Sequence, residues 1–169
     1  MLQIYTGDGK GKTTAALGVA FRAAGYKLKT MMFSFLKDDP EYGEAKAESY
    51  LPGFILRQVG RDAFVNFKNP AAEDLQLCRG GWEEAKLAIS QKQADIFILD
   101  ELNIALATSM LPTDEVVEFL QQHKNDAEII VTGRYAPEEI IKIADLVTEM
   151  REVKHYFHKG VSSRNGIDH

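Results

Sequence analysis

A glycine-rich stretch near the start of the chain has residues of the types that hold phosphate groups. It reads YTGDGKGKTT over residues 5–14 and contains three glycines and two lysines. Its second half matches the P-loop pattern G-x-x-x-x-G-K-[ST], in which backbone N–H groups and a lysine hold phosphates and a hydroxyl holds Mg²⁺. Thr6 stands where that pattern has its first glycine. We therefore predict a phosphate-binding loop in which the phosphates follow an altered path.

Two acidic residues supply the metal ligands that such a loop needs. Asp100 and Glu101 directly follow the apolar run DIFIL at residues 95–99, which is typical of a strand buried on both faces. Ligands of open α/β sheets bind at the carboxyl ends of the strands. Thr13 and one of these acids, Glu101 or Asp100, are therefore predicted to hold Mg²⁺ on the phosphates. A surface turn with two acids is the alternative.

A third stretch, VTGR at residues 131–134, ends another apolar run. If that strand is parallel to the others, Arg134 lies at the same edge of the sheet. It then either neutralises the charge of a leaving group or forms a surface ion pair, and the sequence favours neither. His155 and His158 are too isolated to predict a metal site and are interpreted as solvated or packed histidines.

These residues require a fold that brings strand ends together, and the rest of the sequence predicts one. Apolar runs alternate with helical patterns, which indicates a mostly parallel sheet with helices on both faces. We expect a three-layer α/β fold of the P-loop NTPase kind in one domain, residues 1–169. The expected strands cover residues 2–6, 30–36, 54–59, 95–99, 128–133 and 146–150. The expected helices cover residues 12–24, 41–51, 71–92, 112–122 and 137–144. The tail from residue 155 has no clear periodicity.

The composition excludes several classes of protein. The chain has 169 residues, 45% of them hydrophobic, and a net charge of −5, so its overall field would repel nucleic acid and anionic membranes. Its apolar runs are too short to span a bilayer, and the start of the chain does not read as a signal peptide. Cys78 is the only cysteine, which indicates a reducing, cytoplasmic location and a buried hydrophobic role for the thiol.

Taken together, the motifs resemble one family. TGDGKGKTTAA, FSFLK, ILDELN, VTGR, VKH and GV....GID occur in the order found in the bacterial ATP:corrinoid adenosyltransferases, over essentially the whole chain. The resemblance implies that cob(I)alamin or a precursor corrinoid attacks the 5′ carbon of ATP and that triphosphate leaves. It also implies that ATP lies reversed in the loop relative to ordinary P-loop ATPases, with which the substitution at Thr6 is compatible. Co(I) has no proton to lose, so no general base is required.

The resemblance also assigns roles to residues. Lys12 and Arg134 are the expected catalytic residues, and Glu101 is preferred over Asp100 as the metal ligand. The loop GRDAFVNFKN, residues 60–69, is expected to displace the lower axial ligand of the corrinoid. Its predicted corrinoid-binding residues are Phe64, Asn66 and Phe67, with Asn66 standing where better-known members have tryptophan. The predicted ATP-binding residues are Gly7, Asp8, Gly9, Lys10, Gly11, Lys12, Thr13, Thr14 and Arg22, although a helix-surface charge is the alternative for Arg22.

The expected partners follow from the same family. They are ATP with Mg²⁺, the corrinoid, an electron-donating reductase or flavodoxin-like protein, and a second copy of the chain in a homodimer. Two rival functions remain at this point. One is a P-loop kinase of a small metabolite, although the sequence has no arginine-rich lid insertion, and the other is a nucleotide-dependent switch or chaperone. Triphosphate as product would indicate adenosyl transfer, and ADP would indicate a kinase or an ATPase.

Overall fold

The computed structural model describes residues 1–61 and 65–169. Within them, six parallel strands form one sheet in the order β3-β2-β4-β5-β1-β6. The strands are β1 (Leu2–Thr6), β2 (Thr30–Phe35), β3 (Phe54–Val59), β4 (Ile96–Asp100), β5 (Glu128–Thr132) and β6 (Leu146–Glu149). The helices are α1 (Lys12–Ala24), α2 (Gly43–Ala47), α3 (Ala72–Ser90), α4 (Leu102–Ala107), α5 (Thr113–His123) and α6 (Glu138–Ile143). The predicted α/β class with a parallel sheet is confirmed.

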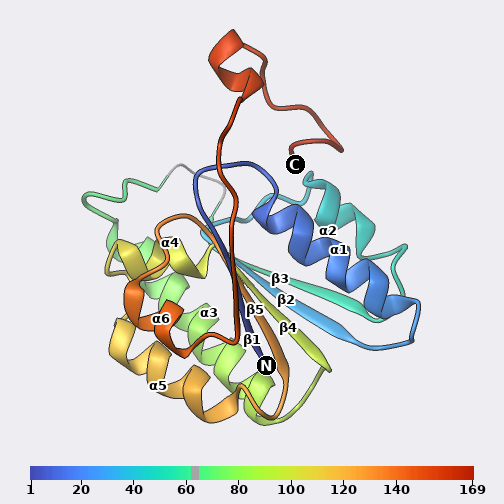
Figure 1. Cartoon of the computed structure of the whole chain (residues 1–169), viewed down its shortest axis with the longest axis vertical. Helices are drawn as coiled ribbons and strands as arrows, with labels where there is room; N and C mark the ends of the chain where they lie inside the picture. The colour runs from blue at the N-terminus through green and yellow to red at the C-terminus, as the bar shows by residue number, and fades with distance from the viewer. Residues whose placement is uncertain (62–64) are drawn as a thin grey trace.

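Helices cover both faces of the sheet, which gives three layers (Figure 1). α1 and α2 lie on one face, where small residues of α1, such as Ala16 and Ala20, pack directly on the strands. α3, α4, α5 and α6 lie on the other face, where the larger of the two cores surrounds the fully buried Trp82. Because both faces are covered, β2, β4 and most of β5 are buried residue by residue, which explains their near-continuous apolar sequences.

The strand order places the chemically interesting loops side by side. β5 lies between β1 and β4, and β4 lies between β5 and β2. The same carboxyl edge therefore receives the segments that follow four strands. They are the glycine loop after β1, Lys37 after β2, Asp100 and Glu101 at the end of β4, and Gly133 and Arg134 of VTGR after β5. This edge is where parallel α/β sheets bind their ligands. The strand order therefore brings the glycine loop, the two acids and Arg134 to one edge of the sheet, as the sequence predicts.

Some elements differ from those expected. α4 begins directly after Glu101, in a stretch for which no helix was predicted, because Glu101 adopts a left-handed backbone (φ 62°) that turns the chain sharply out of β4. The helix expected over residues 41–51 is shortened to α2. The tail contains a short 3₁₀ turn, Tyr156–Lys159, and then returns so that residue 169 lies beside α2 (Figure 1).

Two further expectations concern the cysteine and membrane-spanning segments. Cys78 is buried in α3, and burial raises the pKa of its thiol to about 12, as suits the hydrophobic role predicted for it. None of the helices that the structure describes is long and apolar enough to cross a membrane.

Candidate active site

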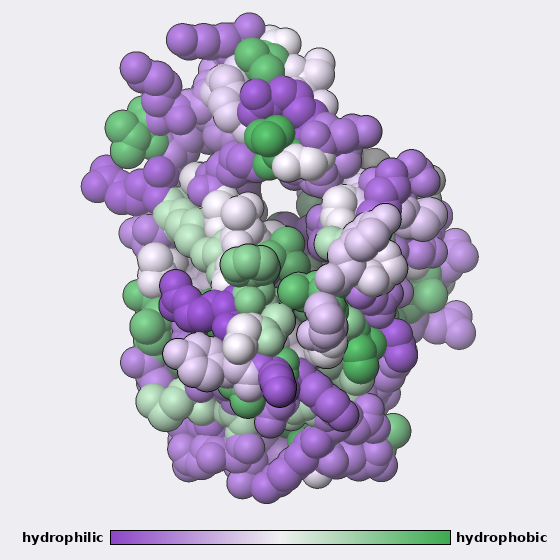
Figure 2. All heavy atoms as spheres, turned by 90° about the vertical axis from the view of Figure 1, so that its right-hand side faces the viewer, coloured by the Kyte–Doolittle hydropathy of each residue, from purple (hydrophilic) through white to green (hydrophobic). Residues whose placement is uncertain are grey.

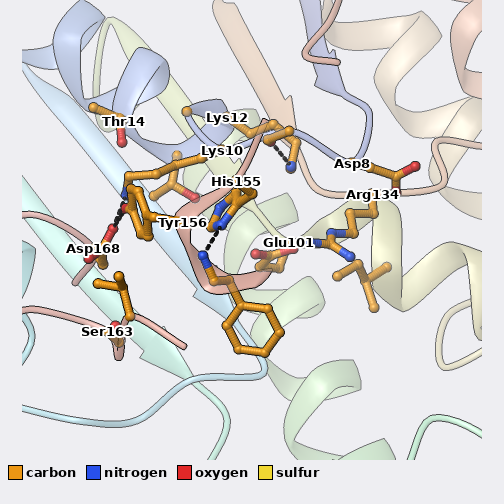
Figure 3. Close-up of a pocket in the computed structure, with 16 residues that line it drawn as sticks. Asp8, Lys10, Lys12, Thr14, Glu101, Arg134, His155, Tyr156, Ser163 and Asp168 are labelled. Atoms are coloured by element: carbon orange, nitrogen blue, oxygen red, sulfur yellow. Dashed lines mark hydrogen bonds and ion pairs between the residues drawn. The ribbon is translucent and has the colours of Figure 1, made fainter. Parts of the chain in front are cut away.

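A cavity of about 370 Å³ opens at the carboxyl edge of the sheet, and we call it the loop cavity. It is bounded by the glycine loop (residues 8–14), by Glu101 and Ile104, by Arg134, and by residues of the tail from His155 to Asp168. Figure 3 shows side chains from these segments directed around a common space. The cavity thus collects most of the residues that the sequence singled out.

The glycine loop is held in place by the segment that follows β6. The N–H of Gly9 donates a hydrogen bond of 2.7 Å to the carbonyl oxygen of Met150. Gly7 has φ 96°, and a Cβ there would lie 2.5 Å from the same carbonyl oxygen. Gly11 has φ 120° and is the N-cap residue of α1, which begins at Lys12. Glycine is required at Gly7 both for the backbone conformation and for the close approach of another segment.

Lys12 lies inside the loop. Its ammonium donates hydrogen bonds to the carbonyl oxygens of Gly7 (2.8 Å) and Gly9 (2.7 Å). Burial lowers the pKa of Lys12, while the negative charge of Glu101 acts in the opposite direction. Within the described residues it has no carboxylate hydrogen-bond partner, so a phosphate oxygen could replace the neutral carbonyl oxygens and pair two opposite charges.

Asp100 is the centre of a buried network. Oδ1 accepts hydrogen bonds from the hydroxyls of Thr13 (2.7 Å) and Thr132 (2.6 Å). Oδ2 accepts from the ammonium of Lys37 (2.8 Å) and from the hydroxyl of Ser34 (3.3 Å). Burial opposes ionisation of this carboxyl, but Lys37 and the hydroxyl donors hold its pKa below the ordinary value. Both oxygens are therefore already well supplied with donors.

The carboxylate of Glu101 differs from that of Asp100 in its hydrogen-bond partners. Its backbone N–H donates to the Thr132 hydroxyl (3.1 Å), but its Oε2 is buried and has no hydrogen-bond partner among the described residues. Burial, followed by the charge of Asp100, raises the pKa of Glu101, while Lys37 and other cations oppose the rise. A Cβ on Gly133 would lie 3.2 Å from this oxygen, so glycine leaves room beside it.

These oxygen atoms suit Mg²⁺. The ion takes hard oxygen ligands and is usually held by one or two carboxylates together with substrate phosphates. Thr13 and Glu101 both border the loop cavity, and Oε2 of Glu101 is buried without a hydrogen-bond partner among the described residues. Asp100 does not line the cavity and instead contacts the Thr13 hydroxyl from behind. The structure thus brings Thr13, Asp100 and Glu101 together. Thr13 and Glu101 border the cavity, and Asp100 lies behind Thr13.

Sequence reasoning assigned no role to Lys37. It follows β2, forms the 2.8 Å ion pair with Asp100 and lies 3.9 Å from Glu101. The available signal was its place two residues after a buried strand, at the same edge as the two acids. Two buried carboxylates side by side call for a cation, and this argument would have pointed to Lys37.

Sequence reasoning also gave no structure to the tail, which closes over the loop. Asp168 pairs with Lys10 (2.9 Å) and with Arg164 (3.1 Å), and it accepts a hydrogen bond from the Tyr156 hydroxyl. Lys10 also donates to the carbonyl oxygen of Ile167 (2.9 Å). Figure 3 shows the contact between Lys10 and Asp168, which both line the cavity. No periodic pattern announces such a tail, because its contacts are made with a distant segment.

Other predicted residues are not brought to the loop cavity. Arg22 is exposed in the last turn of α1 and is not part of the cavity lining. Asn66 and Phe67 are exposed in the loop after β3, and Phe64 lies outside the described residues. Arg134, whose position was conditional on a parallel strand, does line the cavity.

The histidines fall on the tail. The ring of His155 lines the loop cavity, whereas His158 contacts Glu152 at 2.5 Å. The described residues contain no group of three or more histidine, cysteine, aspartate or glutamate side chains placed to hold a metal ion. A metal at this edge would therefore depend on oxygen ligands from substrate as well as protein.

Comparisons with known proteins place the chain in a family. Residues 1–169 match the family described as ATP:corrinoid adenosyltransferase BtuR/CobO/CobP. The chain is 37% identical over 166 residues to the corrinoid adenosyltransferase of Escherichia coli (strain K12), which covers 98% of this chain and 84% of that protein. It is 34% identical over 166 residues to corrinoid adenosyltransferase CobA of Salmonella typhimurium, with the same coverage.

A solved structure agrees at the level of fold. The flagellar accessory protein FlaH from Methanocaldococcus jannaschii superposes with a TM-score of 0.56 at 12% identity, over 88% of this chain and 69% of that one. At this identity the likeness concerns the fold alone. Family membership rests on the sequence matches over the whole chain, and by these the chain belongs to the ATP:corrinoid adenosyltransferase family.

Proposed function

We propose that this corrinoid adenosyltransferase carries out its reaction with the triphosphate of ATP in the loop cavity. The observation that carries the proposal is that Lys12 and Arg134 border one cavity of about 370 Å³ together with the glycine loop, whereas Lys10, which also borders it, is paired with Asp168. In adenosyl transfer the Co(I) of the corrinoid forms a bond to C5′, and the C5′–O bond breaks with its electrons on the triphosphate. A leaving group of such charge needs cations placed in advance.

The basic residues then have separate roles. Lys12 leaves its carbonyl contacts and binds phosphate oxygens together with the N–H groups of the glycine loop at the start of α1. Arg134 borders the same cavity, where it stabilises the charge that appears as the C5′–O bond breaks. No proton needs to be removed from the nucleophile, so the site needs no general base.

Mg²⁺ fits the oxygen ligands of this site. Thr13 and Glu101 would hold it, and the ion would neutralise charge on the phosphate oxygens. Asp100 acts through Thr13, because the hydroxyl donates its proton to Asp100 and leaves its lone pairs for a cation. The buried, unpartnered oxygen of Glu101 supports its place as the direct ligand.

The corrinoid is assigned to the loop after β3, with Phe64, Asn66 and Phe67 as its contacts. Support comes from the family's pattern and from the exposure of Phe67, which is 38% accessible although Val65 of the same loop is buried. The acceptor is cob(I)alamin or a precursor corrinoid. We further propose a cytoplasmic homodimer that receives electrons from a reductase or flavodoxin-like protein, as the family implies.

The products test the reaction. The protein is incubated with ATP, Mg²⁺ and a corrinoid reduced chemically to Co(I), and the phosphates and the corrinoid are analysed. We expect one triphosphate and one Co–C bonded adenosylcorrinoid per turnover, and a large loss of both with Lys12→Ala. Release of ADP without alkylated corrinoid would contradict the proposal and would instead indicate phosphoryl transfer.

A further inference from the structure

Arg134 borders the loop cavity with an exposed side chain. Its guanidinium forms no hydrogen bond or ion pair with any of residues 1–61 and 65–169, the part of the chain that the structure describes. The tail borders the same cavity, and Figure 2 shows the surface hollowed beneath the tail. The place of the guanidinium in this open cavity therefore depends on the backbone that carries it, residues 133–136, which we call the arginine turn.

The arginine turn has an unusual backbone. Gly133 has φ 124° and Tyr135 has φ 61°, so a positive φ occurs on each side of Arg134. For a residue with a side chain, such as Tyr135, this conformation is uncommon and persists where the surrounding structure imposes it. A Cβ on Gly133 would lie 3.0 Å from the Cβ of Asn103 and 3.2 Å from Oε2 of Glu101. The turn thus passes close to other segments, which can determine its conformation.

Two side chains from other elements bind the two ends of the arginine turn. Asn103 is fully buried in α4, and its Nδ2 donates a hydrogen bond of 3.1 Å to the carbonyl oxygen of Gly133. At the other end, the N–H of Ala136 donates a hydrogen bond of 3.3 Å to the hydroxyl of Thr6, the last residue of β1. Arg134 therefore lies between two backbone groups that are each held by a side chain.

We propose that Thr6 and Asn103 are positioning residues for Arg134, an inference that rests on the catalytic role proposed for that arginine. Neither of them lines the loop cavity, so they act on the reaction through the arginine turn and not by touching a substrate. By holding both ends of the turn, they fix the guanidinium where charge develops on the leaving triphosphate. A displacement of about 1 Å can cost a catalytic group roughly a hundredfold in rate.

Thr6 is the residue that departs from the P-loop pattern, which has glycine at this position. A glycine here would leave the N–H of Ala136 without the hydroxyl that accepts its hydrogen bond. The backbone of Thr6 stays part of the sheet edge, since its carbonyl oxygen accepts a hydrogen bond of 2.8 Å from the N–H of Met150. The feature that distinguishes this residue from glycine is therefore a hydroxyl bonded to the arginine turn.

The amide of Asn103 carries a cost for folding stability. Its Oδ1 is buried and has no hydrogen-bond partner among the described residues. A buried polar atom without a partner lowers the free energy of unfolding, and an apolar side chain of similar shape would avoid this part of the cost. The bond that the amide does make, from Nδ2 to the carbonyl oxygen of Gly133, is the one that holds the arginine turn. Positioning of the turn accounts for an amide at this buried place.

The test compares kcat and the KM for ATP, measured with a corrinoid reduced chemically to Co(I). Thr6→Val removes the hydroxyl and keeps the shape of the side chain, whereas Thr6→Ser keeps the hydroxyl. Asn103→Leu removes the amide at similar size. Thr148→Val is the matched control, because Thr148 is exposed in β6, beside β1, and does not line the loop cavity. Each substitution is made in the unchanged protein and in Arg134→Met, and denaturant unfolding shows which variants are folded.

We expect Thr6→Val and Asn103→Leu each to lower kcat by at least about tenfold, because both release one end of the turn. The KM for ATP should change by less than about twofold, since the charge that Arg134 stabilises appears only as the bond breaks. Thr6→Ser should retain most of kcat, and Thr148→Val should change neither constant. In Arg134→Met neither substitution should lower kcat further, because the guanidinium that they position is gone.

A loss of kcat by the same factor in both backgrounds would overturn the inference, because Thr6 and Asn103 would then act independently of Arg134. A raised KM with unchanged kcat would overturn it too, since the residues would then act on ATP binding. Thr6→Val decides the matter even if Asn103→Leu does not fold, because valine suits a strand end.

Failure of the proposed function gives different results. Full kcat in Arg134→Met, or ADP as the product of the unchanged protein, would remove the catalytic role on which the inference rests. A slow Arg134→Met together with full kcat in folded Thr6→Val would overturn the inference alone.

Discussion

The Thr13 hydroxyl donates a hydrogen bond of 2.7 Å to Oδ1 of Asp100. This contact joins the start of α1 to the end of β4, two segments that are far apart in the chain. It also separates the roles of two adjacent acids, because Asp100 is filled with donors on both oxygens whereas Glu101 retains a buried oxygen without a described partner. We therefore expect Asp100 to orient the site and Glu101 to face the ligand.

Removal of the Thr13 hydroxyl tests this arrangement. Thr13→Val keeps the shape of the side chain but removes both the bond to Asp100 and the oxygen proposed for Mg²⁺. We expect kcat to fall by roughly a hundredfold, similar to the loss of a major electrostatic stabiliser. Thr13→Ser is the control and should retain most of the activity. Equal activity of the valine and serine variants in a Mg²⁺ titration would show that the hydroxyl is not used.

Arg134 is expected to act on the leaving group rather than on binding. Arg134→Met should lower kcat by roughly a hundredfold and change the KM for ATP by much less, because the charge it stabilises develops as the bond breaks. Arg57→Met serves as the control, since Arg57 is exposed on the edge strand β3 and pairs with Glu84. Unchanged kcat in the Arg134 variant would reduce this residue to a surface ion pair.

Lys37 is expected to stabilise the fold as well as the site. In Lys37→Met the carboxylates of Asp100 and Glu101 lose the cation nearest to them, and breaking a buried pair in this way costs about 3 kcal/mol of the free energy of unfolding. Adding Asp100→Asn removes the uncompensated charge and should recover part of the loss. Denaturant unfolding of the single and double variants measures this coupling, and strictly additive losses would contradict it.

Asp74 should make the free energy of unfolding depend on pH under acidic conditions. Arg61 contacts its two oxygens at 2.5 and 3.0 Å, the N–H of Ala71 adds a bond of 3.1 Å, and these contacts lower the pKa of Asp74. Its contribution is therefore full above the ordinary aspartate pKa of about 4 and is lost as the pH falls through the lower folded-state pKa. The difference in free energy of unfolding between the unchanged protein and Asp74→Asn should shrink below about pH 4. A constant difference from pH 7 to pH 3 would refute this assignment.

The loop after β3, to which we assign the corrinoid, gives a prediction that distinguishes effects on the corrinoid from effects on ATP binding. Phe64→Ala should keep its affinity for ATP and should still alkylate Co(I) made with a strong chemical reductant. It should fail when a weak biological reductant must reduce bound Co(II), because the aromatic group that we expect to displace the axial ligand is gone. Spectroscopy of Co(II) corrinoid with protein and ATP checks this directly, and a persisting four-coordinate signal in the folded variant would refute it.

Much of this molecule follows from local sequence. Buried strands such as β4 read as continuous apolar runs, and the glycine loop before a helix indicates anion binding through exposed N–H groups, so the strands and the loop were predicted within a few residues. The side-by-side position of Thr13 and the acids could also be expected, because parallel strands share one carboxyl edge. The helix α4 was missed, since its start depends on the left-handed turn at Glu101 that no local pattern marks.

The tertiary structure decided which residues form hydrogen bonds and ion pairs with one another. Local pattern does not distinguish Asp100 from Glu101, and only the resemblance to the family favoured Glu101 as the metal ligand. Successive side chains at a strand end point to different surroundings, and only packing shows that Lys37 and Thr13 bond to Asp100. The tail has no periodicity because its order comes from Lys10, Tyr156 and Arg164 meeting at Asp168, not from a regular backbone. Contacts between segments far apart in the chain leave no spacing to read, and these contacts shape the loop cavity.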